Sequence, residues 1–68
     1  MIAEKVGLRI KEIRSEKGLS QEKLALKADV DRTYLAGVEL GKRNVSLKSL
    51  EKIIIALDVS FEEIFRGM

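Results

Sequence analysis

Residues 20–40, "SQEKLALKADVDRTYLAGVEL", contain two short helical patterns separated by an acidic segment. Leu24 and Ala28 recur at the spacing of one helical face, and Leu35 and Val38 form a second such face after the break. Each pattern spans only two to three turns, so the two helices would have to pack against each other to be stable.

The segment between the two patterns has the chemistry of a tight turn. Asp29 stands where the chain must change direction, and Asp tolerates a left-handed conformation better than most residues other than Gly and Asn. Ala25 is small enough to let two helix backbones approach at a steep angle. Ser20 and Asp31 precede the two helices and can cap them. This arrangement predicts a helix-turn-helix over about residues 20–40, with the N-terminal residues of its second helix available to a DNA major groove.

The N-terminal part of the chain also follows a helical period. Val6, Ile10 and Ile13 form one apolar stripe, and Gly18 follows where a glycine commonly ends a helix. Gly41 has the same position after the second helix of the helix-turn-helix. These signals predict one helix before the helix-turn-helix.

Two further helices follow it. Ser46 precedes one, and Ser60 forms a capping box with Glu63 at the start of another, "FEEIFRGM". The helix after Ser46 has one apolar side, formed by Leu47, Leu50, Ile54 and Leu57. We therefore expect an all-α fold, a compact bundle of five short helices in a single domain over residues 1–68.

The composition limits the classes of function. A chain of 68 residues builds one small core, near the size at which domains need reinforcement. It has no Cys and no His, which removes disulfides and the strongest zinc ligands, and we expect no metal and no cofactor. Most acid–base and nucleophilic enzyme sites use one of these residues, so we expect no catalytic residues and no enzyme. Self-association is the reinforcement that remains.

Charge and hydropathy bear on where the protein works. The net charge is +2, from 13 basic and 11 acidic residues, with the positive excess toward the N-terminus and the negative excess toward the C-terminus. This asymmetry suits DNA at one end and another partner at the other, but an ordinary mixed surface explains it equally well. No apolar run approaches the roughly 18 residues of a membrane span, and we expect a cytoplasmic protein.

The chain resembles a known family over about residues 6–65. "LSQEKLA" and "LDVSFEEIF" resemble the Cro/phage-repressor class of helix-turn-helix proteins, the lambda-repressor-like DNA-binding domains. "DRTYLAGVELGKRN" followed by "SLKSLEKI" resembles, more narrowly, the controller proteins of restriction–modification systems. Two positions depart from the pattern: Asp29, where the class usually has Gly, and Leu40, where controllers often carry a polar or basic residue.

The resemblance implies a transcription regulator that binds DNA through the helix-turn-helix. It places Gln21 and the first N–H groups of its helix on a phosphate, and Arg32 and Thr33 on base edges. Arg can bind guanine through two hydrogen bonds, whereas an ion pair of Arg32 with Asp29 or Asp31 is the structural alternative. For Gln21 the alternative is an exposed helix start.

The residues around the other end of the second helix have expected roles as well. The resemblance places Arg43 and Asn44 on the sugar–phosphate backbone, and Lys42 adds affinity without specificity. The Tyr34 hydroxyl either meets a phosphate or serves the structure alone. Ser49, at the start of the fourth helix, is a candidate phosphate ligand. We expect Glu39 to pair with Lys42 or Arg43.

The last two helices carry more apolar residues than a core of this size needs. We expect Phe61 in the core and a dimerisation surface over about residues 50–68, made by Ile55, Val59, Ile64 and Phe65. A homodimer would place two second helices about 34–36 Å apart, which matches a palindromic operator. Two dimers on adjacent operators, and RNA polymerase contacted through an exposed acid such as Glu22 or Glu39, are further expected partners.

Two other functions remain open. A phage-type repressor or an antitoxin-type autorepressor would share most of these residues, and the neighbouring gene would distinguish them. A protein-interaction module that no longer binds DNA is the alternative of another class. Such a module would have no need of Gln21, Arg32 and Arg43, all of which are present.

Overall fold

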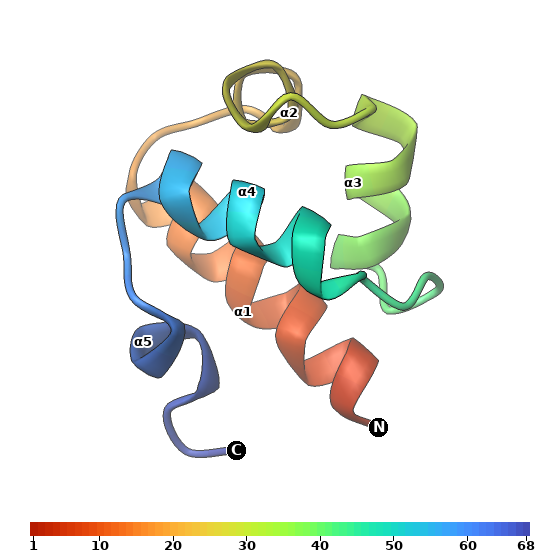
Figure 1. Ribbon diagram of the computed structural model, residues 1–68, viewed down its shortest axis with the longest axis vertical. Helices are drawn as coiled ribbons and strands as arrows, with labels where there is room; N and C mark the ends of the chain where they lie inside the picture. Colours follow the sequence, from red (N-terminus) through yellow and green to blue (C-terminus); the bar gives the residue numbers. More distant parts are fainter.

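The computed structural model describes all of residues 1–68 and contains five α-helices and no strand (Figure 1). The helices are α1 (Ile2–Glu16), α2 (Gln21–Ala28), α3 (Arg32–Glu39), α4 (Leu47–Leu57) and α5 (Phe61–Phe65). They form a body of 27 × 22 × 20 Å, and none of them is long and apolar enough to cross a bilayer. The predicted all-α bundle is confirmed.

Side chains define where four of the helices begin. In each case a Ser or Asp side chain accepts a hydrogen bond from the backbone N–H three residues later. At α5 the bond is reciprocal, because the Ser60 N–H donates to Glu63 Oε1 at 3.2 Å, which completes the predicted capping box. The capping residues are those expected from the sequence: Ser20, Asp31, Ser46 and Ser60.

Two of the helices, α2 and α4, end at an Asp residue with positive φ. Asp29 follows α2 with φ 57° and ψ 47°, and Asp58 follows α4 with φ 58° and ψ 47°. These left-handed residues let backbone N–H groups bond the last carbonyls of each helix. α5 ends at Phe65, earlier than its sequence pattern predicted, because Arg66 has an extended backbone with φ −59° and ψ 127°.

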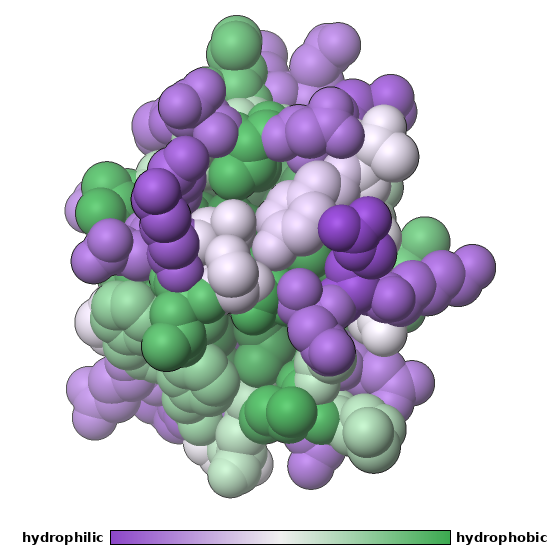
Figure 2. Space-filling view, turned by 45° about the vertical axis from the view of Figure 1, so that its right-hand side comes forward, coloured by the Kyte–Doolittle hydropathy of each residue, from purple (hydrophilic) through white to green (hydrophobic).

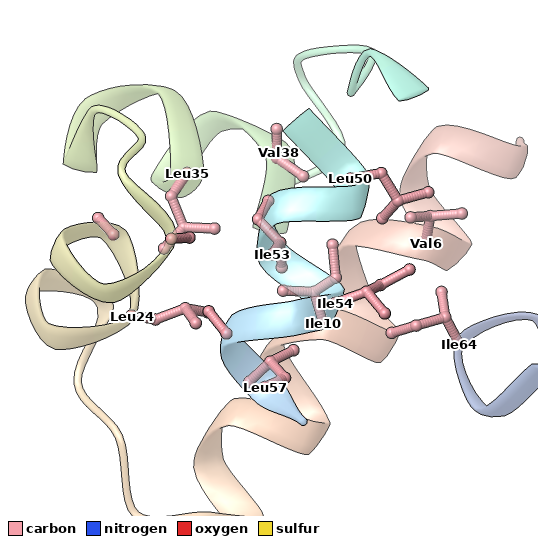
Figure 3. Close-up of a cluster of buried hydrophobic side chains, with 13 residues drawn as sticks. Val6, Ile10, Leu24, Leu35, Val38, Leu50, Ile53, Ile54, Leu57 and Ile64 are labelled. Carbon is pink, nitrogen blue, oxygen red and sulfur yellow. The ribbon is translucent and has the colours of Figure 1, made fainter. Parts of the chain in front are cut away.

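The core lies between all five helices (Figure 3). α1 packs against α3 and α5, while α2 packs against α3 and α4. Ile53 of α4 is fully buried, whereas Leu47, expected on the inner side, is 79 % exposed because it begins α4 beyond the edge of the core. The buried hydrophobic residues are Val6, Ile10, Leu24, Ala25, Ala28, Leu35, Val38, Leu50, Ile53, Ile54, Ala56, Leu57 and Ile64.

α1 and α3 approach closely because α1 has a glycine at their contact. A Cβ at Gly7 would collide with the carbonyl oxygen of Val38. The long helix α1 therefore lies directly against the backbone of α3 and supports it from behind.

α5 is held in place by one buried apolar side chain and by two hydrogen bonds from Arg9 of α1. Ile64 is fully buried, and Arg9 donates hydrogen bonds to the carbonyl oxygens of Glu63 and Arg66 at 2.7 and 2.8 Å. Two expectations are therefore wrong. Ile64 belongs to the core of one chain and cannot lie on a dimer surface, and Phe61, expected in the core, is 46 % exposed. Because α5 is only five residues long, its one inward position is occupied by Ile64.

Candidate nucleic-acid interface

The turn between α2 and α3 has the predicted conformation. Asp29 is left-handed, and the following N–H of Val30 donates to the carbonyl oxygen of Ala25 at 3.0 Å. Asp31 then caps α3 by accepting from the Tyr34 N–H at 3.2 Å. α2 and α3 thus form a helix-turn-helix, and α3 presents its first turn at the surface.

Arg32 and Thr33 occupy that first turn and are both exposed. Arg32 makes no ion pair with Asp29 or Asp31, so its guanidinium is not held by an acid of its own chain. Its guanidinium carries five N–H donors in a planar fork, the geometry that binds guanine or a phosphate through two bonds. This side chain is available to a ligand.

Gln21 begins α2 close to Arg32. The two residues line one surface hollow together with Arg14, Ser20 and Glu22. The hollow has no hydrophobic lining residue, and the N-terminus of α2 adds its unpaired backbone N–H groups. The structure therefore brings Gln21, predicted to bind a phosphate, next to Arg32, predicted to read a base, although the Glu22 carboxylate also lies there.

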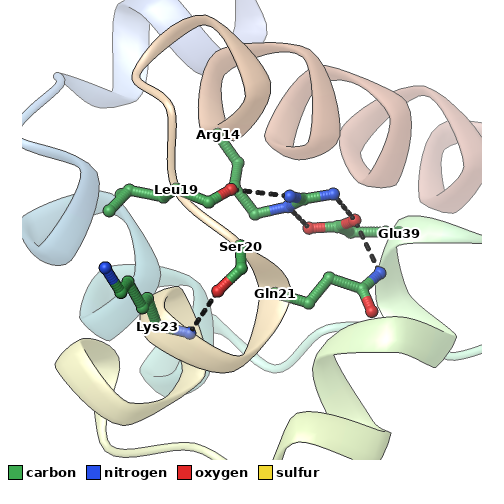
Figure 4. A network of polar contacts seen from close by, with 6 residues as sticks. All are labelled: Arg14, Leu19, Ser20, Gln21, Lys23 and Glu39. Atoms are coloured by element: carbon green, nitrogen blue, oxygen red, sulfur yellow. Dashed lines mark hydrogen bonds and ion pairs between the residues drawn. The ribbon is translucent and has the colours of Figure 1, made fainter.

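Glu39 is part of a polar network behind this hollow (Figure 4). Its carboxylate accepts two hydrogen bonds from Arg14, at 2.7 and 3.0 Å, and a third from Gln21 Nε2 at 3.0 Å. The expectation that it pairs with Lys42 or Arg43 is wrong, because its side chain points inward from α3 toward α1 and α2. Nothing in the local sequence pointed to Arg14, whose partner lies 25 residues away.

Tyr34 joins α3 to the start of α4. Its hydroxyl accepts a hydrogen bond from the Ser46 N–H at 3.2 Å, and the Arg43 guanidinium lies 5.3 Å from the centre of its ring. Burial alone would raise the pKa of the Tyr34 hydroxyl, but hydrogen bonds with Ser49 and Ser46 and the charge of Arg43 outweigh it, so the pKa lies below the ordinary 10.0. Through its contacts with Ser46 and Arg43, Tyr34 orders the loop between α3 and α4. This loop carries the residues predicted to contact the DNA backbone.

That loop contains Lys42, Arg43 and Asn44, and all three are exposed. Gly37 of α3 makes room for it, because a Cβ there would lie 2.7 Å from Cγ of Arg43. The small residue in the middle of α3 therefore leaves space for the Arg43 side chain of the same chain.

A second hollow is lined by three of the predicted residues. Tyr34, Asn44 and Ser49 line it with Ser46 and Lys52. Asp29, Val30 and Asp31 also line it, so two carboxylates lie beside the proposed phosphate ligands. The α4 N-terminus and Lys52 supply the positive potential that would favour an anion. The eight predicted DNA-binding residues thus lie around α3 and the two helix starts that flank it.

An apolar surface lies next to the loop. Figure 2 shows hydrophobic side chains gathered at the lower end of the molecule, where Figure 1 places both termini. A groove there is lined by Ile2, Ala3, Val6, Asn44, Val45, Leu47, Leu50 and Phe65. Of the expected dimer residues, Phe65 lines this groove, whereas Ile55 is 71 % exposed on α4 outside it and Val59 packs partly against the core.

Comparison with known proteins agrees with this geometry. A family profile described as helix-turn-helix matches residues 10–64. The control protein C.MunI of a Mycoplasma species is 50 % identical over 60 residues, which cover 87 % of this chain and 81 % of that protein.

Solved structures agree as well. The restriction–modification controller protein C.AhdI from Aeromonas hydrophila superposes with a TM-score of 0.90 at 49 % identity, covering 93 % of this chain and 96 % of that one. The controller protein C.Esp1396I, solved as a tetramer with its natural 35 base-pair operator, superposes with a TM-score of 0.89 at 48 % identity, covering 96 % and 86 %. The chain belongs to the helix-turn-helix family, within its group of restriction–modification controller proteins.

Proposed function

We propose that this protein is a homodimeric controller that binds a palindromic operator and regulates transcription of its own gene and of a restriction endonuclease gene. One observation carries the proposal: the exposed first turn of α3 shares a hollow with the N-terminus of α2, so Arg32 and Gln21 can meet a base edge and a phosphate together. The chain's membership of the controller group supports it. Such a regulator acts on DNA in the cytoplasm and needs no catalytic group.

Each of the eight residues then has a place in the interface. Arg32 and Thr33 would read bases, and Gln21 with the α2 N–H groups would hold a phosphate on one side. Tyr34, Lys42, Arg43, Asn44 and Ser49 would hold the backbone on the other side. The two groups flank α3, so the helix would be fixed in the groove from both ends.

The dimer must place two α3 helices about 34–36 Å apart on one face of DNA. One chain measures only 27 Å in its longest direction, so the two copies must touch on a surface between their α3 helices. The groove lined by Ile2, Leu47 and Phe65 is our candidate for this surface, because Asn44 of the loop after α3 also lines it. We propose that a second copy covers this groove and that two dimers can occupy adjacent operators.

An acid for RNA polymerase would have to be exposed. Glu39 is only 6 % exposed and is fully engaged by Arg14 and Gln21, so it cannot serve. Glu22 is exposed on α2 and remains our candidate. Replacing Glu22 by Gln should abolish activation while DNA binding is kept or strengthened, because the Glu22 carboxylate also lines the hollow of Gln21 and Arg32. Retained activation would exclude this contact.

The direct test is an unbiased selection of duplex DNA by the purified protein at moderate salt. We expect a palindromic motif with half-sites one helical turn apart, present upstream of the protein's own gene. If no sequence is enriched, the proposed function is wrong, and a protein partner should be sought instead.

A further inference from the structure

A buried carboxylate lies between the two helices of the helix-turn-helix. Glu39 is the only charged residue among those buried, and its side chain is 1 % exposed. It sits in the last turn of α3 and reaches back to α1 and α2 (Figure 4). All three of its hydrogen bonds come from two residues, Arg14 and Gln21.

Stability alone does not account for an ion pair at this position. Removing a carboxylate and a guanidinium from water has a large cost, and a well-packed apolar pair of similar volume is often as stable or more stable. The Arg14–Glu39 pair avoids an unsatisfied charge, since both carboxylate oxygens are bonded. It also gives Gln21 an acceptor that an apolar pair could not provide.

The acceptor fixes the orientation of the Gln21 amide. A carboxylate only accepts hydrogen bonds, so the NH₂ group of Gln21, not its carbonyl oxygen, must face Glu39. That nitrogen carries two hydrogens, and Glu39 takes one of them at 3.0 Å. The second diverges from the first and is left for another acceptor beside the hollow of Arg14, Ser20, Glu22 and Arg32.

The network also sets the position of α2 as a whole. Arg14 Nη1 donates to the carbonyl oxygen of Leu19 at 2.8 Å, two residues before α2 begins. The start of α2 is thereby tied to the end of α3, while the turn at Asp29 ties their other ends. Phosphates and base edges have a fixed separation in B-DNA, so this geometry bears directly on binding.

We propose that Glu39 is a positioning residue for DNA binding: held by Arg14, it orients the Gln21 amide so that one N–H is directed to a DNA phosphate. The inference rests on the proposed DNA-binding function and assigns to it a residue that touches no DNA. It acts through Gln21, so the effects of changing Glu39 and Gln21 must be coupled.

The test is a double-mutant cycle on operator affinity. One background is the unmodified protein, and the other carries Arg14→Met with Glu39→Met, which removes both charges and keeps an apolar contact. We expect Gln21→Ala to lower affinity roughly tenfold or more per half-site in the first background, the effect of losing a hydrogen bond to a charged group. In the second we expect affinity to be already reduced and Gln21→Ala to add less than twofold. Circular dichroism establishes that each variant is folded at the assay temperature.

A purely structural network would give a different result. The pair variant would then bind the operator as tightly as the unmodified protein, or Gln21→Ala would cost the same in both backgrounds, and either outcome overturns the proposal. If the pair variant does not fold, Glu39→Gln replaces it, with Glu16→Gln as a control that removes the same charge from an exposed site on α1. We expect Glu39→Gln alone to lose affinity, and equal affinities of the two variants would overturn the proposal.

The cycle also separates this inference from the function on which it rests. An unmodified protein that selects no DNA sequence would refute both. A protein that selects its operator, but whose changes at positions 21 and 39 are independent, would refute the positioning role alone.

Discussion

Arg32 is the residue on which recognition of the DNA sequence is expected to depend most, because its side chain is unpaired. It is exposed in the first turn of α3 and makes no ion pair, so its side chain requires no rearrangement before it meets a base. Asp31, which the sequence offered as an ion-pair partner, is occupied in capping α3. The sequence identified both residues, but only the structure separates their roles.

Replacing Arg32 by Ala should therefore weaken operator binding and relax specificity at one base position of each half-site. The expected loss is about 1–3 kcal/mol per half-site, the value of one good bidentate contact. Lys27→Ala is a control that removes the same charge from the exposed last turn of α2. Competition binding with operators changed one base pair at a time would measure the effect, and a uniform loss over all sequences would mean that Arg32 holds a phosphate instead.

Tyr34 gives a pH-dependent signal, because it is the only Tyr in the chain. Its pKa in the folded protein lies below the ordinary 10.0, since the bonds with Ser49 and Ser46 and the charge of Arg43 outweigh its burial. At pH values between the pKa of the folded protein and the ordinary 10.0 of the unfolded chain, Tyr34 is therefore more ionised in the folded state. The stabilisation by Tyr34 is absent below the folded pKa, grows as the pH rises through this window, and is fully present above 10.0.

A titration followed by the ultraviolet absorbance of tyrosinate should show this shift. We expect a lower midpoint for the folded protein than for the same protein in denaturant, and a midpoint nearer the ordinary value in an Arg43→Gln variant. Identical midpoints in the folded and unfolded protein would show that Tyr34 does not make these contacts in solution.

At the scale of the helices, the sequence was most informative where the signal is local. Ser20, Asp31, Ser46 and Ser60 each bond a backbone N–H only three residues away, so their caps could be predicted from spacing alone. The inward side of α4 was less clear, because a run of apolar residues offers several possible faces and only packing chooses between Leu47 and Ile53.

The candidate site shows the same division. Its members were predicted largely from the resemblance to controller proteins, and they lie on or beside α2, α3 and the start of α4. The Arg14–Glu39 pair could not be predicted, because its partners lie on different helices and Lys42 and Arg43 are nearer to Glu39 in the chain. Contacts that depend on the packing of two helices have no fixed sequence spacing.

The contact of α1 with α3 leads to a prediction for Gly7. Its missing Cβ lets the backbones meet at Val38, so Gly7→Ala should force the two helices apart. We expect the free energy of unfolding to fall by about 2–3 kcal/mol, in the range of overpacked cores, despite the higher helix propensity of Ala. Urea unfolding compared with Lys11→Ala, an exposed position on the same helix, would measure it. An unchanged midpoint would mean that α1 can move away from α3 at little cost.

For the whole molecule, the core is small enough that the proposed association of two chains should contribute to the stability of the folded state. Only 15 of the 68 residues are buried in the single chain, so a second copy covering the apolar groove would add appreciably to the buried surface. The unfolding temperature should then rise with protein concentration, since association favours the folded state.

Leu47→Lys should raise the dissociation constant of the dimer while each chain stays folded, because it places a charge in the groove at a site already 79 % exposed in one chain. Leu26→Lys is the matched control, an exposed leucine on α2 that lies outside the groove. Sedimentation equilibrium would determine both dissociation constants. If Ile55→Lys separates the dimer and Leu47→Lys does not, the interface lies on the outer side of α4.

The capped starts of the helices also affect how fast the protein folds. A helix whose first turn is fixed by a residue three positions away can form before distant parts of the chain meet, and small helical domains of this kind fold in microseconds to milliseconds. Ribosomes add only about 5–20 residues per second. Folding is then never the slow step in producing an active regulator. In the proposed dimer, the delay would lie in the encounter of two finished chains, which shortens as copies accumulate.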